Sequence, residues 1–131
     1  MINYFTNMLD TIQKSVLSID EKVFNKLVEE CITTIENGHK VVVSGLGKNV
    51  PVCDKFVGTM NSLGQPAVYM NTNSAVHGDI GMVNEGDLVI VLTKSGETAE
   101  SIYLTGLLKK RKCLLWLLTA AETRKTIAMV K

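Results

Sequence analysis

The sequence predicts an α/β fold: a three-layer parallel sheet with helices on both faces, preceded by two N-terminal helices. Short apolar segments of strand length alternate with longer segments whose apolar residues recur at helical spacing. The short segments are almost continuously apolar, which is typical of parallel strands buried on both sides. Strands that alternate with helices in this way predict a single sheet with crossover helices.

The first 38 residues predict two amphipathic helices. Apolar residues between positions 4 and 17 recur on one helical face, and a second stripe runs from 23 to 35. The segment SIDE between them fits a capping box with Ser18 as the N-cap, and Gly38 is a natural stop. Because both helices have an apolar face, they must pack on the domain or on a second subunit.

From residue 39 onward the chain predicts the sheet itself, so that residues 1–131 form a single domain. The turn NEGD leads into one of the strands, and Gly64 closes one of the helices. The expected strands are residues 40–44, 67–70, 87–92 and 113–118, and the expected helices are 50–63, 98–110 and a last one at 122–129.

The composition predicts a folded protein that binds neither nucleic acid nor a membrane. The net charge is +1, whereas a nucleic-acid-binding domain normally has a basic excess. No apolar run approaches the ~18 residues of a membrane span, and the N-terminus does not resemble a secretory signal. Three dispersed cysteines without a C-x-x-C pair indicate reduced, buried thiols, so we expect a cytoplasmic protein.

Polar, glycine-containing segments follow three of the expected strands. They read SGLGKN (residues 44–49), NTNSAVHGDIG (71–81) and TKSGETAE (93–100). Ligands of parallel α/β sheets bind beyond the carboxyl ends of the strands, where helix N-termini converge. The three segments can therefore form one site.

In SGLGKN, glycines after a strand let backbone N–H groups approach an anion at a helix start. A simple glycine turn with Lys48 in solvent explains the same residues without a ligand. A dinucleotide-binding loop is excluded because the third glycine of its G-x-G-x-x-G pattern is missing and no acidic residue ends the next strand.

In TKSGETAE, three hydroxyls (Thr93, Ser95 and Thr98) surround a helix start and offer enough donors for a phosphate monoester. The competing interpretation has Ser95 as an N-cap, with Glu97 and Glu100 favoured by the helix dipole. The density of hydroxyls favours the phosphate.

His77 stands among small residues in a loop, so it can act as a positioned acid or base, or it can cap a helix. It has no clustered Cys or His partners, so the sequence predicts no metal site and no cofactor.

In this order and spacing, SGLGKN, AVHGDIGMV (residues 75–83) and TKSGETAES (93–101) resemble the sugar isomerase (SIS) domain family, most closely its arabinose-5-phosphate isomerases. The resemblance covers about residues 40–119. It implies a flavodoxin-like SIS fold and an aldose–ketose isomerase that interconverts arabinose 5-phosphate and ribulose 5-phosphate through an enediol. A non-catalytic sugar-phosphate sensor is the alternative.

The resemblance also implies roles for individual residues. Lys48, His77 and Glu100 are the expected catalytic residues; the dipole at the helix start makes Glu100 the weaker base, which favours His77 for proton transfer. The family usually has serine at the positions of Asn49 and Thr93. The expected phosphate-binding residues are Ser44, Gly45, Gly47, Asn49, Thr93, Ser95, Gly96 and Thr98.

The family continues with a fifth strand and a second histidine that reaches a partner subunit's site. This sequence ends at Lys131, so we expect a fragment or a shortened homologue with altered catalysis. An uncovered sheet edge and two apolar helices predict a homodimer or homotetramer.

Overall fold

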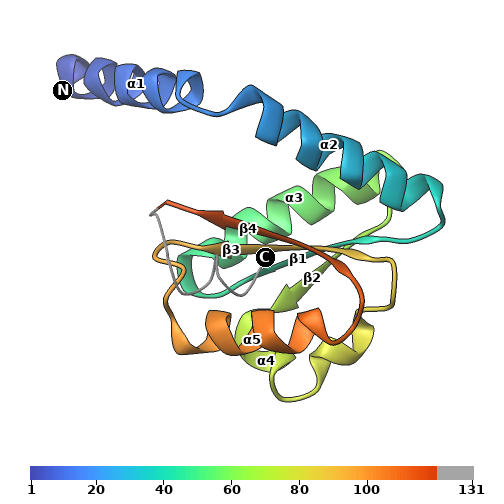
Figure 1. The fold of residues 1–131 in the computed structure, drawn as a ribbon. Coiled ribbons are helices and arrows are strands. Elements are labelled where there is room, and N and C mark those ends of the chain that lie inside the picture. Colours follow the sequence, from blue (N-terminus) through green and yellow to red (C-terminus); the bar gives the residue numbers. More distant parts are fainter. Residues whose placement is uncertain (121–131) are drawn as a thin grey trace.

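The computed structural model describes residues 1–120 and shows a four-stranded parallel sheet between two helical layers (Figure 1). The strand order is β2-β1-β3-β4. The strands are β1 (Val41–Gly45), β2 (Ala67–Asn71), β3 (Leu88–Thr93) and β4 (Leu114–Thr119). The helices are α1 (Ile2–Leu17), α2 (Glu21–Glu36), α3 (Val50–Ser62), α4 (Thr72–Ala75) and α5 (Ala99–Lys109), with short 3-10 helices η1 (Gly47–Asn49) and η2 (Asp79–Met82). The predicted fold class is confirmed, and the helix expected at 122–129 lies outside the described residues.

The sheet is buried on both faces, which explains the continuous apolar runs. Val41 and Val43 face the layer of α2 and α3, whereas Val42 faces the layer of α4 and α5, and all three are buried. A strand in this position has no solvent-facing side, so its sequence does not alternate between polar and apolar residues.

The carboxyl ends of the strands meet at one edge of the sheet. In the parallel register, Gly45 pairs with Asn71 at the end of β2, and Thr93 pairs with Thr119 at the end of β4. The polar segments that follow β1, β2 and β3 therefore emerge at the same edge, as the sequence predicted.

The N-terminal helices differ in how they contact the sheet. The predicted capping box is wrong: Asp20 is the N-cap of α2 and accepts hydrogen bonds from the backbone N–H groups of Lys22 and Val23. Ser18 instead ends α1, where its hydroxyl donates to the carbonyl of Ser15. Helix α2 packs on the sheet, whereas α1 projects away from the domain and has no buried residue (Figure 1). None of the helices in residues 1–120 combines the length and apolar character needed to cross a membrane.

A buried ion pair ties the opposite edge of the sheet together. Asp87, just before β3, accepts a 2.6 Å hydrogen bond from Lys40 Nζ and a 2.8 Å bond from the backbone N–H of Asn84. Burial alone would raise the pKa of Asp87, but these hydrogen bonds and the charge of Lys40 outweigh it, so its pKa is lowered. The carboxylate therefore stays ionised and links the start of β3 to the residue before β1.

Candidate functional site

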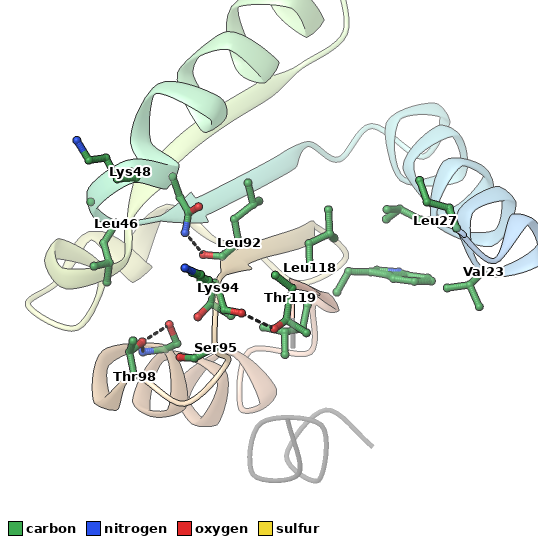
Figure 2. A pocket seen from close by; sticks show the side chains of 18 of the residues that line it. Val23, Leu27, Leu46, Lys48, Leu92, Lys94, Ser95, Thr98, Leu118 and Thr119 are labelled. Atoms are coloured by element: carbon green, nitrogen blue, oxygen red, sulfur yellow. Dashed lines mark hydrogen bonds between the residues drawn. The ribbon is translucent and has the colours of Figure 1, made fainter. Parts of the chain in front are cut away.

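A pocket of about 1100 Å³ lies at the carboxyl edge of the sheet, between α2 and the loops that follow β1, β3 and β4. Figure 2 shows two distinct ends: Lys48, Lys94, Ser95 and Thr98 lie on one side, and Val23 and Leu27 of α2 lie on the other. The polar end comprises Gly47, Lys48, Asn49, Thr93, Lys94, Ser95, Thr98 and Ser101. The apolar end comprises Ile19, Val23, Phe24, Leu27, Trp116 and Leu118.

The loop after β1 is shaped by close packing. A Cβ added to Gly45 would lie 2.9 Å from Asn49 Cβ and 3.0 Å from Cys53 Sγ, so only glycine lets α3 start this close to β1. Asn49 Nδ2 donates a 3.0 Å hydrogen bond to the carbonyl of Leu92, which ties the loop to β3. Lys48 lines the pocket with an exposed side chain whose amino group points away from Ser95 and Thr98 in Figure 2.

The hydroxyls of the loop after β3 hold that loop in shape. Thr93 Oγ1 accepts a hydrogen bond from the N–H of Gly96, and Ser95 Oγ accepts one from the N–H of Glu97. A hydroxyl that accepts one bond keeps its own O–H proton for another partner. Thr93 and Ser95 can therefore organise the loop and still donate to an anion.

Thr98, not Ser95, is the N-cap of α5. Its side-chain oxygen accepts from the N–H of Ser101, and its hydroxyl lies 2.7 Å from Ser101 Oγ. Both side chains line the pocket at the start of the helix, where the partial positive charge of the helix dipole favours an anion. Thr98, which was expected to bind phosphate, therefore also caps α5.

Three of the expected phosphate-binding residues lie behind the pocket instead of lining it. Ser44 is fully buried, and its hydroxyl shares a 3.0 Å hydrogen bond with Thr72 at the start of α4. Gly45 and Gly96 are buried as well, and Gly96 has a φ of 69°, a conformation that favours glycine. These residues shape the backbone around the polar end.

Of the three expected catalytic residues, only Lys48 lines the pocket. His77 is exposed in the turn between α4 and η2, and it caps neither helix, because Val76 and Gly78 occupy those positions. Glu100 is exposed in the first turn of α5. It follows Thr98 by two residues, about 200° around the helix axis, and so lies on a different face from Thr98 and Ser101.

The sequence prediction missed two polar residues, Lys94 and Ser101, and the whole apolar end. Lys94 stands inside the TKSGETAE segment, and Ser101 follows Thr98 by three residues, so helical spacing could have placed both at the site. The apolar residues of α2 gave no such signal, because they were interpreted only as a packing stripe. Trp116 anchors this end: its indole Nε1 donates to the carboxylate of Glu30 on α2.

The electrostatics of the polar end suit an anion. Lys48 and Lys94 bring positive charge to the lining, and the acidic residue that also lines the pocket, Asp20, already caps α2. Within the described part of the chain, no group of three or more His, Cys, Asp or Glu side chains is placed to hold a metal ion.

Residues 34–127 match the SIS domain family. The chain belongs to this family. Over 103 residues the SIS domain is 32% identical to the arabinose 5-phosphate isomerase KdsD of Yersinia pestis, a match that covers 79% of this chain and 31% of that protein. The chain thus spans about a third of the length of the curated relatives it matches.

Solved structures show the same fold. A Bacteroides fragilis protein, described as a candidate phosphosugar isomerase involved in capsule formation, superposes with a TM-score of 0.84 at 28% identity, covering 97% of this SIS domain and 69% of that chain. An Escherichia coli CFT073 protein in complex with arabinose 5-phosphate has a TM-score of 0.77 at 29% identity, covering 94% and 70% of the two chains.

Proposed function

We propose that this SIS domain binds a phosphorylated sugar and acts as an aldose–ketose isomerase that interconverts arabinose 5-phosphate and ribulose 5-phosphate. The observation that carries the proposal is the polar end of the pocket, where the hydroxyls of Thr93, Ser95 and Thr98 and the side chain of Lys94 lie near the start of α5 and Lys48 lines the pocket from the loop after β1. The similarity to the Yersinia pestis isomerase and to the Escherichia coli protein in complex with arabinose 5-phosphate supports this choice of substrate.

In the proposed complex, the phosphate lies against the start of α5. Thr93 and Ser95 donate their hydroxyl protons, and Lys94 contributes charge from the same segment. Asn49 uses one amide N–H for Leu92, so the second N–H is available to the ligand. At this position the family usually has a serine; here the Asn49 amide would contact the phosphate and also fix the loop.

The proposed reaction moves a proton between C1 and C2 of the sugar. A base removes the proton from one carbon to give an enediol, and the same proton is returned to the other carbon while the carbonyl and hydroxyl exchange places. We propose His77 for this transfer, Glu100 for orienting a hydroxyl, and Lys48 for stabilising the developing oxyanion. Neither His77 nor Glu100 lines the pocket in this conformation, so their roles have to be tested separately from binding.

Binding and turnover are separated by two measurements on the same protein. Thermal unfolding with five- and six-carbon sugar phosphates is expected to show the largest stabilisation with arabinose 5-phosphate. An isomerase assay is expected to detect ribulose 5-phosphate, with at least a hundredfold loss in His77→Ala. Full activity in His77→Ala contradicts the assignment of the proton transfer. The absence of stabilisation by every sugar phosphate contradicts the binding proposal.

A second candidate function is a non-catalytic sugar-phosphate sensor. The observation that favours it is the position of His77 and Glu100 outside the pocket lining. Stabilisation by arabinose 5-phosphate without detectable turnover under any condition is the result expected of a sensor.

A further inference from the structure

Tyr69, near the end of β2, forms a side-chain hydrogen bond that crosses to β1. Its hydroxyl donates to the carbonyl of Gly45, the last residue of β1, over 3.0 Å. Burial raises the pKa of Tyr69 above its usual range, and the hydrogen bond from Asn71 only partly opposes this rise. The phenol therefore stays protonated at neutral pH and remains a donor to β1.

Asn71, the last residue of β2, connects this phenol to helix α4. Its amide nitrogen donates to the hydroxyl oxygen of Tyr69 over 3.1 Å. Its amide oxygen caps α4 by accepting a 2.9 Å bond from the N–H of Asn73 and a 3.3 Å bond from the N–H of Ser74. Because backbone N–H groups only donate, the amide oxygen must face α4, which leaves the nitrogen for the phenol.

Helix α4 in turn holds the turn that contains His77. The backbone N–H of His77 donates a 3.0 Å hydrogen bond to the carbonyl of Ser74. At the other end, Gly45 lies three residues before Lys48 in the chain. The hydrogen bonds of Tyr69 and Asn71, called here the Tyr69–Asn71 link, therefore join the loop that carries Lys48 to the turn that carries His77.

We propose that Tyr69 and Asn71 are positioning residues that hold the loop of Lys48 and the turn of His77 in a fixed relation to each other. The inference rests on the proposed function, in which Lys48 and His77 act on the same sugar. Neither Tyr69 nor Asn71 is among the described residues that line the pocket, so both act through the loops. A displacement of about 1 Å in a reacting group can lower a rate by about a hundredfold, so the relation between these loops matters for turnover.

The Tyr69–Asn71 link can be broken without unfolding the sheet. The ring of Tyr69 packs against the core cluster that includes Cys53 of α3, and phenylalanine keeps this packing. The buried hydrogen bond between Ser44 and Thr72 joins β1 to the start of α4 independently. The proposed phosphate site lies in the loop after β3, whose hydroxyls bond within that loop. We therefore expect a broken link to slow turnover and to leave phosphate binding unchanged.

Three variants of the full chain separate the link from the cap of α4. Tyr69→Phe removes the hydroxyl, and Asn71→Asp keeps an oxygen for the cap but has no N–H to donate to Tyr69. Asn71→Ala loses both functions. In the isomerase assay, kcat is expected to fall about tenfold in all three variants, with KM within about twofold of wild type. Only Asn71→Ala is expected to lower Tm, by about 4 °C.

A double variant and two matched controls complete the kinetic test. Tyr69→Phe with Asn71→Asp is expected to have the kcat of either single variant, because both remove the same link. Tyr103→Phe, at an exposed position of α5, and Asn73→Ala, at an exposed position of α4, are expected to leave kcat, KM and Tm unchanged.

NMR spectra test the link without turnover. In ¹H–¹⁵N spectra of the full chain, Tyr69→Phe is expected to shift the amide resonances of both Lys48 and His77, whereas Tyr103→Phe is expected to shift neither. An inactive wild-type chain would contradict the proposed function. These shifts would then still decide whether Tyr69 and Asn71 hold the two loops together.

Three results would overturn the positioning role. The first is wild-type kcat in Asn71→Asp, because Asn71 would then serve only as the cap of α4. The second is a raised KM with unchanged kcat in Tyr69→Phe, which would assign the hydroxyl to binding. The third is a Tyr69→Phe spectrum in which the amide resonances of Lys48 and His77 do not move.

Discussion

At the scale of single residues, the site depends on side chains that hold the backbone of the loops in place and can also donate hydrogen bonds to the ligand. Asn49 fixes the loop after β1 to β3 through the Leu92 carbonyl, and Thr93 fixes the loop after β3 through the N–H of Gly96. The sequence predicted that these residues belong to the site, because they directly follow strands. Their hydrogen-bond partners could not be predicted, because the Leu92 carbonyl lies 43 residues from Asn49 in the chain.

The hydrogen bond from Asn49 to Leu92 predicts that the loop after β1 and strand β3 stabilise each other. Asn49→Ala is expected to lower the free energy of unfolding by about 1 kcal/mol, because the Leu92 carbonyl loses its side-chain donor. Asn49→Asp is expected to cost more, since it places a carboxylate against a carbonyl oxygen. Asn73→Ala, at an exposed position, is the control. Urea unfolding measures all three, and an Asn49→Asp variant as stable as wild type would disprove the coupling.

The Asp87 carboxylate predicts how stability depends on pH. Its pKa is lower in the folded chain than in the unfolded chain, so its contribution is fully present above the unfolded pKa near 4. That contribution is lost as the pH falls through the lowered folded pKa. Asp87→Asn is expected to destabilise the protein by about 3 kcal/mol at pH 7, because Lys40 keeps a charge without its partner.

Urea unfolding of wild type and Asp87→Asn between pH 7 and about pH 3 checks this prediction. The difference between the two proteins is expected to shrink as the pH decreases. A difference that stays constant over this range would exclude the Asp87 carboxylate as its source.

At the scale of secondary-structure elements, the sheet was predictable and the contacts of α2 were not. The four strands lie within one residue of their expected bounds, because continuous apolar runs between polar turns leave few alternatives. The cap of α2 was misplaced because Ser18 and Asp20 are both good N-caps, and only the geometry of the chain decides between them. The apolar end of the pocket arises where α2 lies over β4, which no local pattern in the sequence indicates.

A pair of glycine substitutions tests the close packing of β1 against α3. Gly45→Ala is expected to cost about 1–3 kcal/mol, because its Cβ would overlap Asn49 Cβ and Cys53 Sγ. Gly58→Ala, inside α3 and with open space around it, is expected to stabilise the protein by about 0.5–1 kcal/mol. Chemical unfolding measures both. Equal effects of the two substitutions would contradict the packing argument.

At the scale of the whole molecule, one end of the pocket is suited to an anion and the other to an apolar surface. The polar end was predictable, because its residues follow parallel strands and the carboxyl ends of such strands meet at one edge. In the proposed function, the phosphorylated sugar takes the polar end of the pocket.

The central claim is that the polar end recognises the phosphate of a sugar. Isothermal titration of the full chain with arabinose 5-phosphate and with arabinose tests it most directly. The account predicts binding of the phosphate ester alone, weakened at least tenfold in Thr93→Val and Ser95→Ala, and unchanged in Thr59→Val on the exposed face of α3. Equal binding of both sugars, or a Ser95→Ala, Thr93→Val double variant that binds as tightly as wild type, would contradict it.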